Sequence, residues 1–218
     1  MIASSINQSP VVYTPTPANL ASVAVTRQDS TVGAKAHPQT NVVQFVLKTT
    51  NSLKNNEVIE FRVPVSQFLL TDIAEVQCLS SGPQSTMQPT ACTIDMTPPA
   101  EHFVLRYSVK CVTVCPPQST FTLSVTGGIS NPTWISAANS ITSVLATTLT
   151  ADLQYKIDQR TSNVIATPGL VEGSLTQMQL QKTPGLVGAA TSLSFSFKTL
   201  NLIPKQGSIA ITFADDSL

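Results

Sequence analysis

The sequence alternates apolar and polar residues most clearly in the run Phe103-Val104-Leu105-Arg106-Tyr107-Ser108-Val109-Lys110. Every second residue of this run is Phe, Leu, Tyr or Val, and the residues between them are mostly polar. A period of two is typical of a β-strand that buries one face, because successive side chains point to opposite sides of the sheet. The run therefore predicts a half-buried strand.

The same period recurs elsewhere, and no segment has the three- and four-residue spacing of an amphipathic helix. The other runs are 43–47, 59–63, 121–126 and 153–157, with a weaker β-branched run at 141–149. Turn-forming residues separate them at 51–56, 80–89, Pro116-Pro117, Gly127-Gly128 and Asn131-Pro132. About seven short strands over roughly 150 residues predict an all-β fold, a two-sheet antiparallel β-sandwich.

The composition excludes several partners. The chain has 218 residues, 12 Lys+Arg against 12 Asp+Glu and only 11% charged residues, whereas a soluble domain usually has roughly 25%. A zero net charge without a basic cluster argues against nucleic acid. The longest uncharged stretch, 111–151, is interrupted by Pro and Gly, so we expect no membrane span. The first ten residues have no secretion-signal pattern, which indicates a leader already removed or a piece of a longer chain.

An internal repeat is the strongest feature of the sequence. Residues 20–27 match 175–182, and Val32-Gly33-Ala34 matches Val187-Gly188-Ala189 at the same offset. After a small gap, 45–51 matches 195–201 and 59–63 matches 209–213. We interpret residues 1–13 as an extended tail or linker, 14–166 as a complete module, and 167–218 as the start of a second module.

The second module has only its first three strands in this sequence. Three strands cannot bury an apolar face alone, so we expect something to cover the face, and we assign it as a self-assembly surface. Its cover would come from later modules of a tandem array or from strands of another copy, bound head to tail. The predicted surface residues are Leu193, Phe195, Phe197, Ile209, Ile211 and Phe213.

Two stretches carry a resemblance to a known family: Ala166-Thr167-Pro168-Gly169, and the run 193–213 that contains Asn201-Leu202-Ile203-Pro204. They resemble the TPG linker and the following hairpin of the tandem immunoglobulin-like modules of large protist, especially ciliate-type, surface proteins. Asn131-Pro132 resembles the end of that family's cysteine-bearing half. The resemblance covers nearly the whole chain. It implies an immunoglobulin-like sandwich and an extracellular or cell-surface location.

All four cysteines lie in the first module. We expect disulfides between Cys78 and Cys92 and between Cys111 and Cys115, the second only if 112–114 turn. An extended strand would hold the last two roughly 13 Å apart, too far for a disulfide, and crossed pairing would then result. Zinc is the competing use of four cysteines, but Cys-x3-Cys beside two single cysteines is weak spacing for it. Disulfides indicate an oxidising compartment.

The sequence contains few signals for catalytic, glycosylation, calcium or interface sites. No catalytic motif is present, so we predict no enzymatic activity, no catalytic residues and no cofactor. Asn7-Gln8-Ser9 is a glycosylation sequon, and glycans are therefore possible partners. Asp158 and Asp215-Asp216 are candidate calcium ligands between modules, with exposed surface charges as the alternative. Trp134 is the single Trp, for which packing over the end of the sandwich competes with an interface role.

These features together predict an extracellular structural protein that forms a fibre, filament or surface coat. Thr/Pro-rich linkers would be extended and would set the module spacing. The alternative is a cell-surface adhesin or receptor ectodomain that binds a glycan or a protein through one set of loops. A viral coat protein would also explain the low charge, but it would not explain the repeat.

Overall fold

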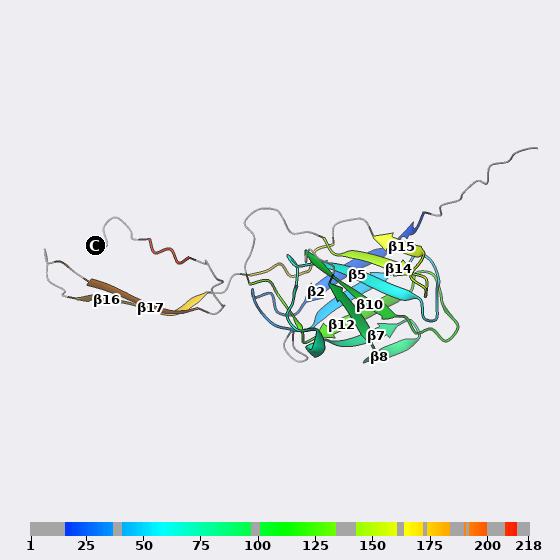
Figure 1. Ribbon diagram of the computed structural model, residues 1–218, viewed down its shortest axis with the longest axis horizontal. Coiled ribbons are helices and arrows are strands. Elements are labelled where there is room, and N and C mark those ends of the chain that lie inside the picture. The colour runs from blue at the N-terminus through cyan, green and yellow to red at the C-terminus, as the bar shows by residue number, and fades with distance from the viewer. Residues whose placement is uncertain are drawn as a thin grey trace, which may run out of the picture.

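The computed structural model describes residues 16–36, 41–96, 101–133, 143–160, 164–171, 174–183, 190, 192–199 and 208–212. The described residues form an all-β fold whose one helix is the short 3-10 turn η1 (Ile73–Glu75). Most of the strands lie in the sandwich drawn in Figure 1. No helix in these ranges has the length and apolar character needed to cross a membrane.

Two sheets make up the sandwich. In spatial order, one contains β1 (Ala18–Asn19), β15 (Lys156–Arg160), β14 (Leu145–Leu149), β5 (Val58–Pro64), β10 (His102–Ser108) and β9 (Cys92–Met96). The other contains β2 (Ser22–Arg27), β3 (Val43–Lys48), β12 (Thr120–Thr126), β7 (Gln77–Gly82) and β8 (Ser85–Pro89). Short pairs are β11 (Val114–Cys115) with β4 (Leu53–Lys54), and β13 (Ile129–Ser130) with β6 (Leu69–Leu70).

The strand order is that of an immunoglobulin-like domain. The orders β2-β3-β12-β7 and β15-β14-β5 reproduce the A-B-E-D and G-F-C sheets of that fold, in the same order along the chain. The segment β8-β9-β10 is inserted between the fourth and fifth of these strands and widens both sheets. The predicted immunoglobulin-like antiparallel sandwich is therefore confirmed.

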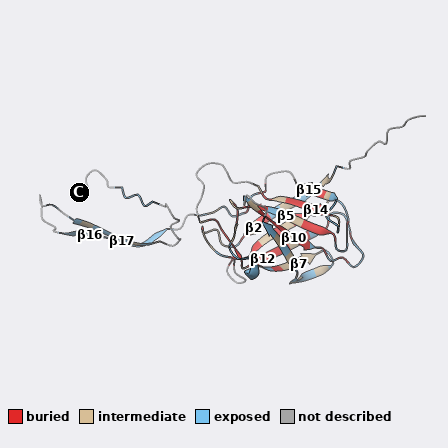
Figure 2. Ribbon diagram, viewed as in Figure 1, coloured by how far each residue is buried: buried red, intermediate tan, exposed pale blue. Residues whose placement is uncertain are grey.

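The core is formed where the predicted alternation places it. The residues of β10 that point inward, Phe103, Leu105 and Tyr107, are buried and face the opposite sheet. The Phe45 and Phe61 rings, one from each sheet, lie 4.9 Å apart between centroids. Figure 2 shows this buried layer along the central strands. Burial of large apolar side chains between the sheets is the main stabilising term of such a fold.

Two predicted segments differ from the structure. The expected strand at 153–157 is wrong in its first half, because Leu153 and Tyr155 lie in an exposed turn and β15 begins only at Lys156. The expected turn at 80–89 is in fact the hairpin of β7 and β8, with its tight turn at Pro83-Gln84. Its hydroxyl-rich residues resemble a loop because this hairpin lies at the edge of its sheet.

The linker after the module also differs from the prediction. Thr167 bridges Thr26 and Val171 bridges Thr31, both in parallel, so residues 164–171 lie along β2 and the residues that follow it. Val164 and Ala166 are buried in the core. A linker that supplies core side chains and backbone hydrogen bonds is part of the domain, and it does not act as a free extended spacer.

Candidate self-assembly surface

The strands β16 (Leu175–Thr183) and β17 (Ser192–Thr199) form an antiparallel hairpin, a separate two-stranded sheet (Figure 1). Its register reproduces that of β2 and β3. Val25 pairs with Phe45 in the sandwich, and Leu180, its counterpart in the repeat, pairs with Phe195. The neighbouring pairs from Gln179 to Lys182 match in the same way, so the repeat recognised in the sequence is also a repeat in strand pairing.

Several apolar side chains of this hairpin and of residues 208–212 are exposed, whereas most of their counterparts in the sandwich are buried. Leu180 is 59% exposed and Val25 is 1% exposed. Ile209 is 49% exposed, and its counterpart Ile59 is fully buried. Figure 2 shows the contrast between the hairpin and the sandwich strands. The strands β12 and β14, which extend the sheets of β3 and β5 in the first module, have no counterpart among the described residues after 174.

A largely apolar groove of about 450 Å³ lies between the hairpin and residues 208–212. Leu193 and Phe197 in β17 are partly buried, and Phe213 lies outside the described residues. Such a groove suits the alternate apolar side chains of an added strand. The apolar residues that line it are Leu175, Met178, Leu180, Phe195, Phe197, Ile209, Ala210 and Ile211.

The first disulfide joins the two sheets. Cys78 in β7 and Cys92 in β9 are bonded, with their Cα atoms 6.2 Å apart. The backbone N–H of Thr90 also donates to the Cys78 carbonyl over 3.0 Å. The bond therefore fastens the point where the chain passes from β8 in one sheet to β9 in the other.

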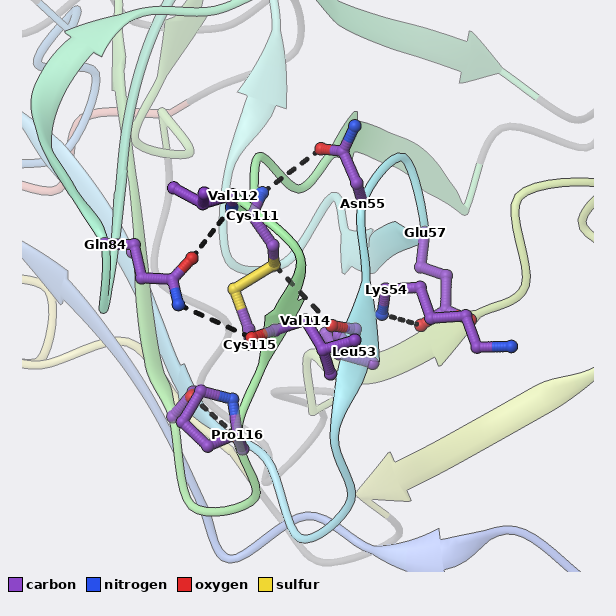
Figure 3. The surroundings of a disulfide bond; sticks show 12 residues. Leu53, Lys54, Asn55, Glu57, Gln84, Cys111, Val112, Val114, Cys115 and Pro116 are labelled. Atoms are coloured by element: carbon purple, nitrogen blue, oxygen red, sulfur yellow. Dashed lines mark hydrogen bonds between the residues drawn. A yellow bond between two sulfur atoms is a disulfide. The ribbon is translucent and has the colours of Figure 1, made fainter.

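The second disulfide closes a tight loop, drawn in Figure 3. Cys111 and Cys115 have Cα atoms 5.5 Å apart, because residues 112–113 bend. The Gln84 amide accepts a hydrogen bond from the Val112 N–H over 2.8 Å and donates to the Val114 carbonyl over 3.4 Å (Figure 3). Both disulfides are the pairs that the sequence favoured, and the described residues contain no free cysteine.

The other predicted positions divide into two groups. Asn7, Trp134 and Asp215-Asp216 lie outside the described residues. Asp158 is fully buried, and its carboxylate accepts hydrogen bonds from the N–H groups of Thr50 and Asn51 and from the Asn51 side chain. Its observed role is to fix the loop after β3. Within the described ranges, no three His, Cys, Asp or Glu side chains gather as a metal site would require.

Sequence reasoning missed one buried polar cluster. Arg27, at the end of β2, is 3% exposed and lies over the Phe68 ring at 4.7 Å. It donates to the side-chain oxygens of Asn131 over 3.2 Å and Gln67 over 3.3 Å. Burial without a paired carboxylate lowers its pKa to about 10. A single Arg at a strand end gives no sequence signal of burial, because such residues are usually solvated.

Comparisons with known proteins leave the function open. No protein-family model and no curated protein matches the sequence. One similar solved structure carries the description "AvmM Catalyzes Macrocyclization in Alchivemycin A Biosynthesis", at 8% identity and TM-score 0.33, covering 86% of this chain and 91% of that one. Another is the group B streptococcus pilus 2b backbone protein, at 9% identity and TM-score 0.39, covering 84% of this chain and 77% of that one.

Proposed function

We propose that this chain is an extracellular structural protein whose immunoglobulin-like modules assemble into a fibre, filament or surface coat. The observation that supports it is the exposed apolar face of residues 175–183, 192–199 and 208–212, most of whose counterparts are buried in the first module. Full burial of one such side chain contributes about 1.5 to 3 kcal/mol. Several of them on one face favour association with strands that complete the sandwich.

The direction of the chain supports a linear arrangement. The strand β2 begins at Ser22, beside Lys48 and Thr120, and this end of the sandwich is called the amino end. The chain leaves along residues 167–171, beside residues 26–31 at the opposite, carboxyl end. Arrival and departure at opposite ends allow successive modules or copies to follow one another head to tail. Two disulfides support an oxidising, extracellular setting.

The proposal includes membership of the protist surface-protein family that the sequence resembles, and it assigns no enzymatic activity. The partners are further modules of the same kind, in the same chain or in another copy. Glycans are proposed as modifications.

The test is self-association measured by sedimentation velocity over a range of concentrations. The double variant Leu180→Ser, Ile211→Ser should remain monomeric where the wild type forms larger species. Val112→Ser is the matched control, because Val112 is 84% exposed but lies in the Cys111–Cys115 loop of the first module. Equal association of all three proteins would contradict the proposal.

A second candidate function has one observation in its favour. Leu153 and Tyr155 are exposed in the loop between β14 and β15, at the amino end of the sandwich. The disulfide loop with exposed Val112 lies at the same end, since it leads into Thr120. An adhesin would bind its target through such loops. Glycan-array binding that Tyr155→Ser abolishes would favour this alternative.

A further inference from the structure

The first and last segments of the module pair in parallel, whereas the other ladders between the described strands are antiparallel. At the amino end, Ala18 and Asn19 of β1 pair with Asp158 and Gln159 of β15. At the carboxyl end, residues 25–32 pair with residues 167–171. We name this second pairing the terminal clamp.

Four backbone hydrogen bonds hold the terminal clamp together. The N–H of Arg27 donates to the Thr167 carbonyl over 2.8 Å, and the Thr167 N–H donates to the Val25 carbonyl over 2.9 Å. Further along, the N–H of Val32 donates to the Val171 carbonyl over 3.1 Å, and the Val171 N–H donates to the Ser30 carbonyl over 2.8 Å. The two segments are therefore bonded at both ends of their overlap.

The buried Arg27 cluster reinforces the same pairing. Gln67 Oε1 accepts from the Arg27 guanidinium and also from the Ala166 N–H over 3.1 Å. The Asn131 side chain accepts from Arg27 and donates to the carbonyls of Asp29 and Thr31 over 2.8 and 2.7 Å. One cluster thus connects the end of β2, the residues after it and the linker.

The direction of the strands decides how tension acts on these bonds. Tension on the chain pulls β2 toward the amino end and residues 164–171 toward the carboxyl end. Because the two segments run parallel and overlap, the pull is directed along the strands, and it loads the four hydrogen bonds together. In an antiparallel hairpin pulled from its open end, the bonds would break one after another.

We propose that the terminal clamp is a mechanical element, which resists extension of the module when the chain is under tension. The tension itself rests on the proposed fibre role. The clamp is nevertheless a property of the single chain, and it is tested without any filament. Failure of this test and failure of the assembly test are therefore separate results.

The experiment is single-molecule force spectroscopy on the full chain, held by handles at its two ends with both disulfides intact. Val171→Pro removes the N–H that donates to Ser30. Val171→Ala is the matched control, because it shortens the same exposed side chain and keeps the N–H. At a fixed force, Val171→Pro should unfold the module about fivefold faster than Val171→Ala, the effect of one lost hydrogen bond.

The unfolding rates of the same two variants are also measured in urea without force. A general loss of stability would raise the unfolding rate of Val171→Pro in urea as well as under force. The proposal expects a clearly larger ratio of the two rates under force than in urea. Equal ratios under both conditions, or no difference under force, would overturn it.

Discussion

The repeat offers a matched pair of substitutions with the same chemistry in two environments. Ile59 and Ile209 occupy equivalent positions, but the first is fully buried and the second is 49% exposed. Ile59→Ala removes a side chain that is packed between the sheets and leaves a cavity, for which a loss of about 2 to 5 kcal/mol is typical. Ile209→Ala removes a half-exposed side chain without a closed cavity, so we expect a loss below about 1 kcal/mol.

The assay is urea unfolding at a concentration where sedimentation shows a monomer, with far-ultraviolet circular dichroism as the signal. At higher concentration, self-association should show the opposite order of effects. Ile209→Ala should weaken self-association, whereas Ile59→Ala should not, because Ile59 is not part of that surface. A loss of 2 kcal/mol or more for Ile209→Ala in the dilute monomer would refute the reasoning, since it would mean that the chain itself covers the face.

Three further changes test the sandwich. Replacing both Cys78 and Cys92 by Ser removes a disulfide between residues 14 positions apart. This should lower the free energy of unfolding by about 3 kcal/mol, and an unchanged urea midpoint would contradict the prediction. Tyr107 has a buried hydroxyl with no partner among the described residues, so Tyr107→Phe should raise stability by up to about 1 kcal/mol. Burial also raises the pKa of Tyr107 above its usual 10.0, so the wild type should lose stability above pH 10 and the Phe variant should not show that part of the loss. Asp158→Asn should destabilise by about 1 to 3 kcal/mol in thermal unfolding, because three N–H donors lose a carboxylate acceptor.

The central strands could be predicted from the sequence because they bury one face. The run beginning at Phe103 alternates cleanly, and it became β10. The tight turn at Gly127-Gly128 was equally readable, since both residues have positive φ and a Cβ on Gly127 would lie 2.4 Å from the Glu75 carbonyl oxygen. In such places local pattern and tertiary structure agree.

Edge strands and contacts between distant segments could not be predicted from the local alternation of apolar and polar residues. The hairpin of β7 and β8 buries little, so its composition resembles a loop. The docking of Thr167 on β2 and the buried hydrogen bond from Arg27 to Asn131 each join residues more than a hundred positions apart. The exposed residues Leu180 and Ile209 could be identified for a different reason, because the internal repeat aligns them with Val25 and Ile59, which are buried.

The most direct test of the account is the intact mass of the protein from its native source, after deglycosylation and without proteolysis, together with electron microscopy of the same sample. The account predicts either a mass far above 23.1 kDa, which would mean a tandem array, or a mass near this value with filaments, which would mean completion by another copy. A mass near 23.1 kDa with dispersed monomers and no filaments would contradict the claim that the apolar residues of 175–183, 192–199 and 208–212 form an assembly surface.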